Sequence, residues 1–301
     1  MAHLGRILSW WGQDYAYAAY WQVRGTLRPG KKEALRSGTL RPVVIVPGVW
    51  EPWGFLGPVI EALHRAGHPV HVVTALGRNS RPVEDSAHTV AGFLAERDLH
   101  DVVIVAHSKG GLIGKFVMGE LDPESRITSM VAISTPFAGS DYARFMMTRT
   151  LRAFSPNDPT TLRMQRNVEV NARITTISGV FDPHIPRIVA LEGATNITID
   201  DGGHFRVLDR PEVIDIVLEV AGRPAVVQER MVDEAVAAAT DASSPPSATD
   251  TGSATSAASD TRPAPAAPDT GPTQAPPAPG IPLPPDAEVH RGGTPETPSV
   301  P

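Results

Sequence analysis

The chain has 301 residues, which is more than one average domain but not clearly two, and it contains no cysteine. The lack of cysteine excludes disulfides, thiolate metal sites and a cysteine nucleophile. Residues 222–301 hold 4 Arg against 10 Asp and Glu, so the whole formal charge of −6 lies there and the remainder is neutral. A neutral body offers nucleic acid no basic surface, so we expect no nucleic-acid partner.

Residues 1–40 form an aromatic-rich N-terminal segment. The simplest interpretation of its pattern is a helix that packs on the main domain. The alternative is a helix within residues 1–28 that contacts lipid, because Trp and Tyr favour the membrane–water boundary. The helix is expected to end near Gly25, and its apolar residues recur at helical spacing: Leu4, Leu8, Trp11, Tyr15 and Ala18.

Localisation follows from what the sequence lacks. No uninterrupted apolar run approaches the length of a membrane span. Ser9, Gln13 and Asp14 interrupt the N-terminal segment, which therefore has no clean signal-peptide core. We expect a cytoplasmic protein, with peripheral membrane contact through the N-terminal helix as the alternative.

Residues 41–222 alternate between strand and helix patterns, which predicts one α/β domain with a mainly parallel sheet and helices on both faces. Several of the strand patterns are wholly apolar, as expected for parallel strands buried on both faces. The predicted helices are Leu56–Ala66, Val83–Arg97, Gly110–Glu120 and Pro211–Val220. The predicted strands are Pro42–Val46, Val70–Thr74, Val102–Ala106, Ile127–Ser134, Arg173–Gly179 and Asn196–Ile199.

The C-terminal residues 223–301 are rich in Ala, Pro, Ser, Thr and Asp and carry few bulky apolar residues. Of the 30 prolines in the chain, 16 lie between Pro224 and Pro301. Such a segment cannot bury enough apolar surface to offset the entropy of ordering, so we expect a disordered acidic tail.

The strongest local signal is Ala-His-Ser-Lys-Gly-Gly at 106–111, where an apolar strand leads directly into a turn and then a helix. Small residues two positions on either side of Ser108 allow the tight turn that exposes a nucleophilic hydroxyl. The N-terminus of the following helix favours an oxyanion, and the backbone N–H of Lys109 is the expected first donor. We expect His107 to be a buried orienting residue and the Lys109 side chain to face solvent or the pocket rim.

A nucleophilic serine needs a base and an acid, which follow it along the chain in the order Ser, Asp or Glu, His. His204 comes after the last predicted strand, in a glycine-rich turn, and is the expected base. Asp182 follows the preceding strand and is the expected acid, which would orient the imidazole and stabilise its charged form. Asp200 and Asp201 are the competing acids, but they lie too close to His204 in sequence to reach its ring easily.

The second oxyanion donor is expected in the loop after the first strand of the domain. There Gly48 allows close approach of the backbone, and the N–H of Val49 or Trp50 would serve as donor. The alternative is an ordinary Pro-Gly turn.

Five motifs carry a family resemblance: Val-Pro-Gly-Val-Trp at 46–50, the serine motif at 106–111, Ile-Ser-Thr-Pro-Phe-Ala-Gly-Ser at 133–140, Ser-Gly-Val-Phe-Asp at 178–182 and Gly-Gly-His-Phe at 202–205. Together they resemble the α/β-hydrolase superfamily, on its lipase and PGAP1-like branch, from about Pro42 to Ala221. The chain departs from many lipases at Pro47, where those have His, and at Ala106, where those have Gly. Neither departure removes a triad atom.

The resemblance implies an α/β-hydrolase fold and a carboxylic ester hydrolase, lipase- or esterase-like, that acts through an acyl-enzyme on Ser108 without a metal or cofactor. Its partner would be a small-molecule or lipid ester. Residues 141–170 are a candidate cap, in which an acyl pocket and plain core packing are both possible interpretations. Trp50 and Trp53 are candidate pocket walls, and the cap adds Phe145, Met146 and Met147.

Two rival hypotheses remain. An acyltransferase or thioesterase would use the same triad, with a different acyl donor or acceptor. A catalytically silent scaffold would recruit partners through its tail or its aromatic N-terminus.

Overall fold

The computed structural model describes residues 2–27, 32–139, 155, 157–185 and 187–224 of the chain. Nearly all of the predicted tail and the first half of the candidate cap therefore lie outside the described residues. In the second half of the cap the structure describes the helix α6, Pro159–Arg166, followed by a 3₁₀ turn at Glu169–Arg173.

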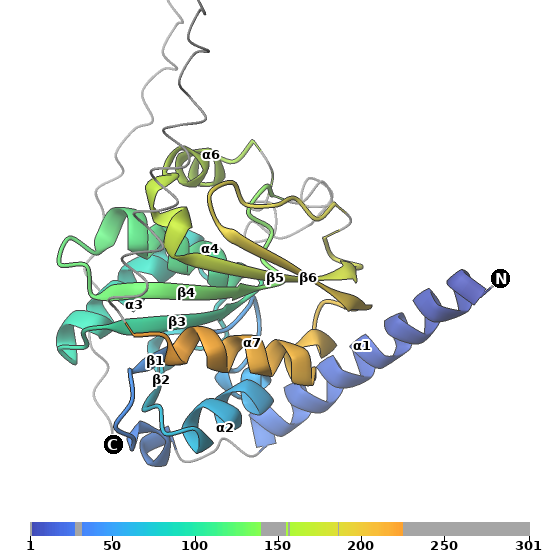
Figure 1. Ribbon diagram of the computed structural model, residues 1–301, viewed down its shortest axis with the longest axis horizontal. Coiled ribbons are helices and arrows are strands. Elements are labelled where there is room, and N and C mark those ends of the chain that lie inside the picture. The colour runs from blue at the N-terminus through green and yellow to red at the C-terminus, as the bar shows by residue number, and fades with distance from the viewer. Residues whose placement is uncertain (1, 28–31, 140–154, 156, 186, 225–301) are drawn as a thin grey trace, which may run out of the picture. The chain divides into compact units, whose positions relative to one another are not determined.

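In the described part of the chain, six parallel strands form one sheet in the order β2-β1-β3-β4-β5-β6 (Figure 1). In this order β2 lies on one side of β1, and β3 to β6 follow one another on the other side. The carboxyl ends of β1 and β3 therefore flank a switch point of the topology, where ligands of open α/β sheets bind. The strands are β1 Val43–Val46, β2 Val70–Val72, β3 Val102–His107, β4 Ile127–Ile133, β5 Ile174–Phe181 and β6 Thr195–Gly202.

Helices cover both faces of this sheet. The chain enters through α1, Ala2–Leu27, and its other main helices are α2 Gly57–Arg65, α3 Val83–Glu96, α4 Lys109–Phe116 and α7 Pro211–Gly222. A π-helical turn at Val117–Leu121 extends α4. Shorter 3₁₀ turns are Lys32–Arg36, Trp53–Leu56, Thr74–Leu76 and Arg206–Asp209.

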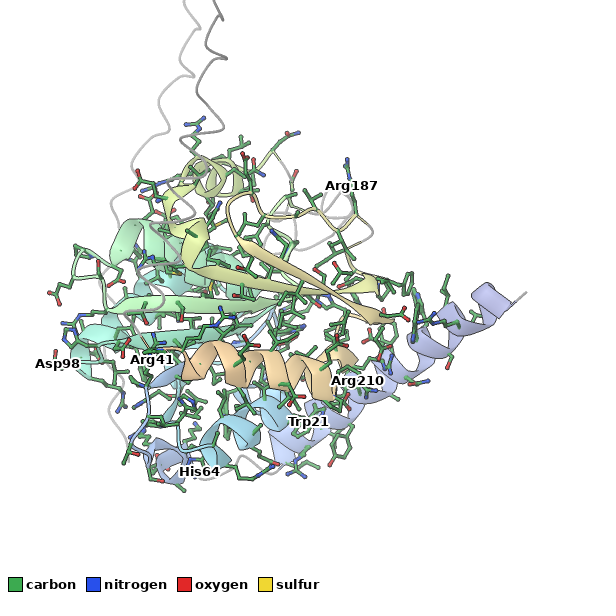
Figure 2. All side chains as sticks on the ribbon, viewed as in Figure 1. Trp21, Arg41, His64, Asp98, Arg187 and Arg210 are labelled. Atoms are coloured by element: carbon green, nitrogen blue, oxygen red, sulfur yellow. The ribbon has the colours of Figure 1, made fainter. Side chains whose placement is uncertain are left out.

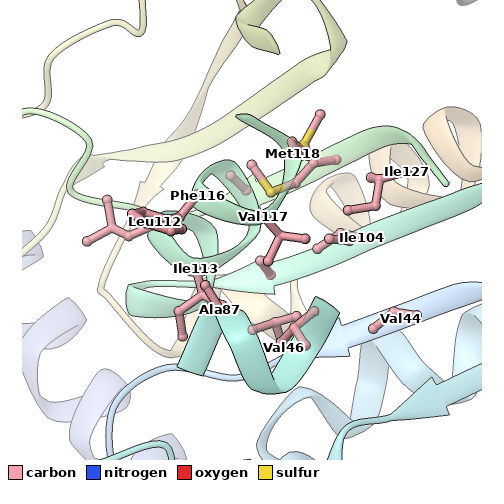
Figure 3. Packing of buried hydrophobic residues seen from close by; sticks show 14 of the residues in the cluster. Val44, Val46, Ala87, Ile104, Leu112, Ile113, Phe116, Val117, Met118 and Ile127 are labelled. Carbon is pink, nitrogen blue, oxygen red and sulfur yellow. The ribbon is translucent and has the colours of Figure 1, made fainter. Parts of the chain in front are cut away.

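The all-apolar strands are explained by two cores, one on each face of the sheet. Successive side chains of a strand point to opposite faces. Val44 and Val46 of β1 accordingly join the core beneath α3 and α4, shown in Figure 3, whereas Val43 and Ile45 join the core with α2 and α7. All four are fully buried, so every position of β1 must be apolar.

The predicted α/β-hydrolase architecture of a parallel sheet with helices on both faces is thus confirmed, and the predicted elements match the observed ones to within a few residues. The largest difference among the strands is β6, which continues through Asp200 and Asp201 to Gly202. It is an edge strand, half exposed, and therefore tolerates polar residues that a buried strand excludes.

The N-terminal helix α1 packs against the α/β domain, as its simplest interpretation predicts. Trp10, Asp14 and Tyr17 are buried on one side of it, and Tyr17 Oη donates a hydrogen bond to the Phe55 carbonyl at 3.1 Å. Trp21 lies where α1 passes α2 (Figure 2), so close that a Cβ at Gly57 would come within 2.3 Å of its ring. The helix is therefore part of the domain's packing.

Another face of α1 is exposed and apolar, with Leu8 63%, Trp11 43% and Tyr15 42% accessible. Within the described ranges no helix is long and apolar enough to cross a membrane. Contact of this face with lipid stays a prediction.

Candidate active site

Ser108 occupies the turn between β3 and α4 with φ 50° and ψ −120°, a backbone conformation that a non-glycine residue rarely adopts. The turn is tight because the helix starts directly against the loop that follows β1. A Cβ at Gly110 would lie 2.0 Å from the Val46 carbonyl oxygen, so only glycine is accommodated there. The turn is further held by Thr135, whose Oγ1 donates to the Ser108 carbonyl at 3.0 Å.

The structure brings the three predicted triad residues together from three separate strand ends. The Ser108 hydroxyl donates to His204 Nε2 at 3.0 Å, and His204 Nδ1 donates to Asp182 Oδ2 at 2.8 Å. The other oxygen of Asp182 accepts the backbone N–H groups of His184 and Ile185 at 2.8 and 2.9 Å. The carboxylate is thus fixed on one side by the backbone and holds the imidazole with the other.

Charges within this buried chain alter the acidity of its members. Burial disfavours a charged His204, but the Asp182 carboxylate outweighs it, so the pKa of His204 is raised. Burial alone would raise the pKa of Asp182, yet His204 and the two N–H donors hold it below its ordinary value. The pair therefore favours an ionised acid beside an imidazole that accepts protons readily.

The competing acids and the other downstream histidine have different roles. Asp200 is largely exposed and pairs with Arg6 at 2.7 Å, and Asp201 pairs with Arg206 at 2.5 Å. The ring of His184 lies beside that of His204, with 4.8 Å between their centroids. Burial, reinforced by the charge of His204, lowers the pKa of His184 to about 4, so His184 is neutral at neutral pH.

The predicted oxyanion donors lie around Ser108. Lys109 is the first residue of α4, where the backbone N–H has no partner within the helix. The N–H groups of Val49 and Trp50 donate to no acceptor in the part of the chain that the structure describes. Trp50 has φ 61°, again a strained conformation. All three N–H groups remain candidates for an oxyanion.

The prediction that the Lys109 side chain faces solvent or the pocket rim is wrong. The side chain is fully buried, and its ammonium donates to three neutral oxygens: the carbonyl and Oδ1 of Asn79, at 2.8 and 3.0 Å, and the Arg81 carbonyl. Burial lowers the pKa of Lys109 to about 7. A loop that follows β2 covers the lysine, and nothing in the local sequence reveals this.

The prediction that His107 is buried is confirmed. Its Nδ1 lies 2.8 Å from Glu51 Oε1, and its Nε2 lies 2.9 Å from the backbone oxygen of His204. Glu51 is itself 2% exposed and accepts the Gly48 N–H through Oε2 at 2.6 Å. His107 therefore connects the loop of the base to the loop after β1.

A pocket lies beside Asp182, at the carboxyl ends of β4 and β5. Its walls combine apolar residues with polar and charged ones, which include Ser134, Thr176, Asp182 and Arg187. The apolar residues are Ala132, Pro136, Phe137, Ala138, Ile177, Ile185, Ile188 and Val189. Trp53 is partly buried and packs against the core with α2 and α7, and its role as a pocket wall stays a prediction. Phe145, Met146 and Met147 lie outside the described residues.

Three residues of the site's surroundings were missed from the sequence: Glu51, Asn79 and Asp14. Asp14 Oδ1 accepts the N–H groups of Phe205 and Arg206 at 2.7 and 2.9 Å, directly after the base. A signal existed for Asp14 alone, because it shares a helical stripe with buried Trp10 and Tyr17 and is the polar member of that stripe. Asn79 lies in a polar loop, where no periodic pattern indicates that a side chain is buried.

A parallel sheet of this order, with a strained strand–serine–helix turn and with serine, acid and histidine in that chain order, defines the α/β-hydrolase fold. No protein-family model matches the chain, and no curated protein matches it significantly.

Among solved structures 457 chains match, at low identity. The mature lipase of Bacillus licheniformis is 14% identical, covers 62% of this chain and 93% of its own, and has a TM-score of 0.47. A monoacylglycerol lipase of Paleococcus ferrophilus is 18% identical, with coverage of 65% and 97% and a TM-score of 0.42. An extracellular α/β-hydrolase from a Paenibacillus species is 18% identical, with coverage of 61% and 100% and a TM-score of 0.44. The PGAP1-like branch stays a prediction.

Proposed function

We propose that the protein is a serine hydrolase that cleaves carboxylic esters through Ser108, His204 and Asp182. The observation that carries the proposal is the unbroken hydrogen-bonded chain from Ser108 Oγ through the imidazole to Asp182 Oδ2, at 3.0 and 2.8 Å, on a strained turn. Such strain and such a chain have no structural purpose of their own, but both prepare a hydroxyl for attack.

The reaction follows from the positions of these groups. His204 Nε2 takes the hydroxyl proton while Ser108 Oγ attacks the ester carbonyl, and the N–H of Lys109, with that of Val49 or Trp50, binds the resulting oxyanion. When the intermediate collapses, His204 returns the proton to the leaving alcohol and an acyl-enzyme remains. A water molecule, deprotonated by His204, then attacks the acyl group, and the acid leaves as Ser108 recovers its proton.

The apolar residues in the wall of the pocket beside Asp182, such as Phe137 and Ile185, support an apolar group on the ester. We keep the substrate class at carboxylic esters, since a thioester or an acceptor other than water would use the same proton transfers.

The test is labelling with a fluorophosphonate probe together with hydrolysis of p-nitrophenyl esters of increasing acyl length. We expect the folded wild type to be labelled and active, and Ser108→Ala to lose both. The matched control is Ser129→Ala in β4, a buried serine whose hydroxyl has no partner among the described residues. Labelling that is absent from the folded wild type, or that persists in Ser108→Ala, would refute the proposal. Preference for a thioester over the matched ester would redirect it to a thioesterase.

A further inference from the structure

Both neighbours of the nucleophile extend buried side chains toward the same loop, Pro47–Glu51, although they leave Ser108 in different directions. His107 reaches this loop through Glu51. Lys109 reaches it through Asn79, whose Nδ2 donates to the Pro47 carbonyl at 2.7 Å. All four residues, His107, Glu51, Lys109 and Asn79, are at most 2% exposed.

The two connections end on a single peptide group. The carbonyl oxygen of Pro47 accepts from Asn79, and the N–H of the same peptide bond, on Gly48, donates to Glu51 at 2.6 Å. A peptide plane that is held at both its oxygen and its hydrogen cannot rotate unless both bonds break. The next residues along the chain are Val49 and Trp50, which carry the candidate oxyanion donors.

We infer that His107 and Lys109 are positioning residues that clamp the Pro47–Gly48 peptide through Glu51 and Asn79, and so hold the second oxyanion donor in a preformed orientation toward Ser108. The inference rests on the proposed function of this site. It assigns the two flanking residues of the serine a role beyond forming the turn, since each holds, through its partner, one end of the same peptide group.

The chemistry of Lys109 supports this role. Burying an ammonium against neutral oxygens is costly, and its pKa is correspondingly lowered to about 7 by burial. Plain packing of the turn would be served equally well by an apolar side chain of that length. Hydrogen bonds to Asn79 and Arg81 need a donor, and they orient the asparagine whose amide holds Pro47.

The main test variant is Asn79→Gly. Asn79 has φ 49°, which glycine adopts without strain, and the variant keeps the backbone carbonyl that accepts from Lys109. It removes the link to Pro47 together with Oδ1, which accepts from Lys109 and from the Ser86 hydroxyl. The matched control is Ser125→Gly, because Ser125 has φ 51° and is exposed on a turn far from this loop in sequence. The second variant is Glu51→Gln. Its amide oxygen can accept from either the Gly48 N–H or His107 Nδ1, but its amide nitrogen then presents a donor to the other.

The readouts are kcat and KM for p-nitrophenyl ester hydrolysis and the inhibition constant of phenylboronic acid, whose boron accepts the Ser108 oxygen and becomes a tetrahedral anion. We expect kcat to fall by about tenfold to a hundredfold in each variant, with KM nearly unchanged and boronic acid binding weakened in parallel. Because both variants release the same peptide, the double variant should lose much less than the product of the single losses. Ser125→Gly should match the wild type.

A folded Asn79→Gly or Glu51→Gln with wild-type kcat and wild-type boronic acid affinity would overturn the clamp, even if its melting temperature fell. The clamp would also be overturned if the loss of kcat in the double variant equalled the product of the two single losses. That result would show that Asn79 and Glu51 act on separate groups. A wild type that neither hydrolyses the ester nor binds phenylboronic acid would refute the proposed function instead.

Discussion

Asp14 on α1 provides a sharp test of whether the N-terminal helix belongs to the active site. Its carboxylate is fully buried and accepts the N–H groups of Phe205 and Arg206, the two residues after the base. Asp14→Ala leaves both donors without a partner. Each unsatisfied buried donor costs about 1–3 kcal/mol, so the loss of both should lower the free energy of unfolding by about 2–6 kcal/mol. That is a large share of the ~5–15 kcal/mol that stabilises a typical domain.

A matched variant separates the hydrogen bonds from the charge. Asp14→Asn can keep the oxygen that accepts both N–H groups, and its amide nitrogen replaces Oδ2, which has no partner among the described residues. The exchange of a charged for a neutral acceptor should cost about 1 kcal/mol, and the buried amide N–H should cost about 1–3 kcal/mol more where it finds no acceptor. Gln13→Ala is the control on the exposed side of α1, where the side chain bonds only Ser9 among the described residues, and it should change stability by less than ~0.5 kcal/mol.

Urea unfolding measures the stability of these variants, and kcat for ester hydrolysis, per folded molecule, measures the position of His204. Release of the loop that carries the imidazole should lower kcat by about tenfold or more in Asp14→Ala. A stability within about 0.5 kcal/mol of the wild type, the range typical of surface substitutions, would contradict the packing of α1 described above. A stability loss with unchanged kcat would show that Asp14 supports the fold but not the base.

Two further predictions concern charge. Asp182→Asn should lower kcat by about 10⁴-fold. Because Asp182 raises the pKa of His204, the acid limb of the pH–rate profile should also move to lower pH in this variant. An acid limb that does not move would show that Asp182 does not set the pKa of His204. Lys115 in α4 is 2% exposed, and burial lowers its pKa from 10.5 to about 8, so Lys115→Met should stabilise the fold by up to about 3 kcal/mol at pH 7. Above pH 8 the folded lysine is neutral while the unfolded lysine stays charged, so that gain should shrink as the pH rises from 8 to 10.5. Urea unfolding at pH 7 and pH 10 measures the gain, and an equal gain at both pH values would contradict this burial cost.

Local patterns were sufficient for the sheet and for the order of the triad. The β1 and β3 strands are apolar at every position because both faces are covered, and that burial is visible as an unbroken apolar run. Ser108 could be predicted because its tight turn restricts the residues on both sides. Asp182 and His204 could be predicted because parallel strands end at one edge of the sheet, which brings the loops after β5 and β6 to the loop after β3.

The support around the triad could not be predicted, because its contacts depend on tertiary structure. Asp14 lies 191 residues from Phe205, and Lys109 lies 30 residues from Asn79. A lysine in this position is expected to face solvent unless the loop that covers it, which contains Asn79 and Arg81, is known. Glu51 follows a Pro-Gly turn as a single acid, and such an isolated residue gives no periodic signal of burial.

The loop that carries the base is held from three directions, and each contact comes from a different part of the chain. His107 approaches the backbone oxygen of His204, Asp14 accepts the N–H groups of the next two residues, and Asp182 holds the ring itself. A proton transfer at 3.0 Å depends on the backbone of this loop as much as on the ring, because the ring can be aligned only if its Cα is fixed. The N-terminal helix is thus bonded to the same loop as the neighbour of the nucleophile, and removing either contact should disturb one common quantity, the distance between Ser108 Oγ and His204 Nε2.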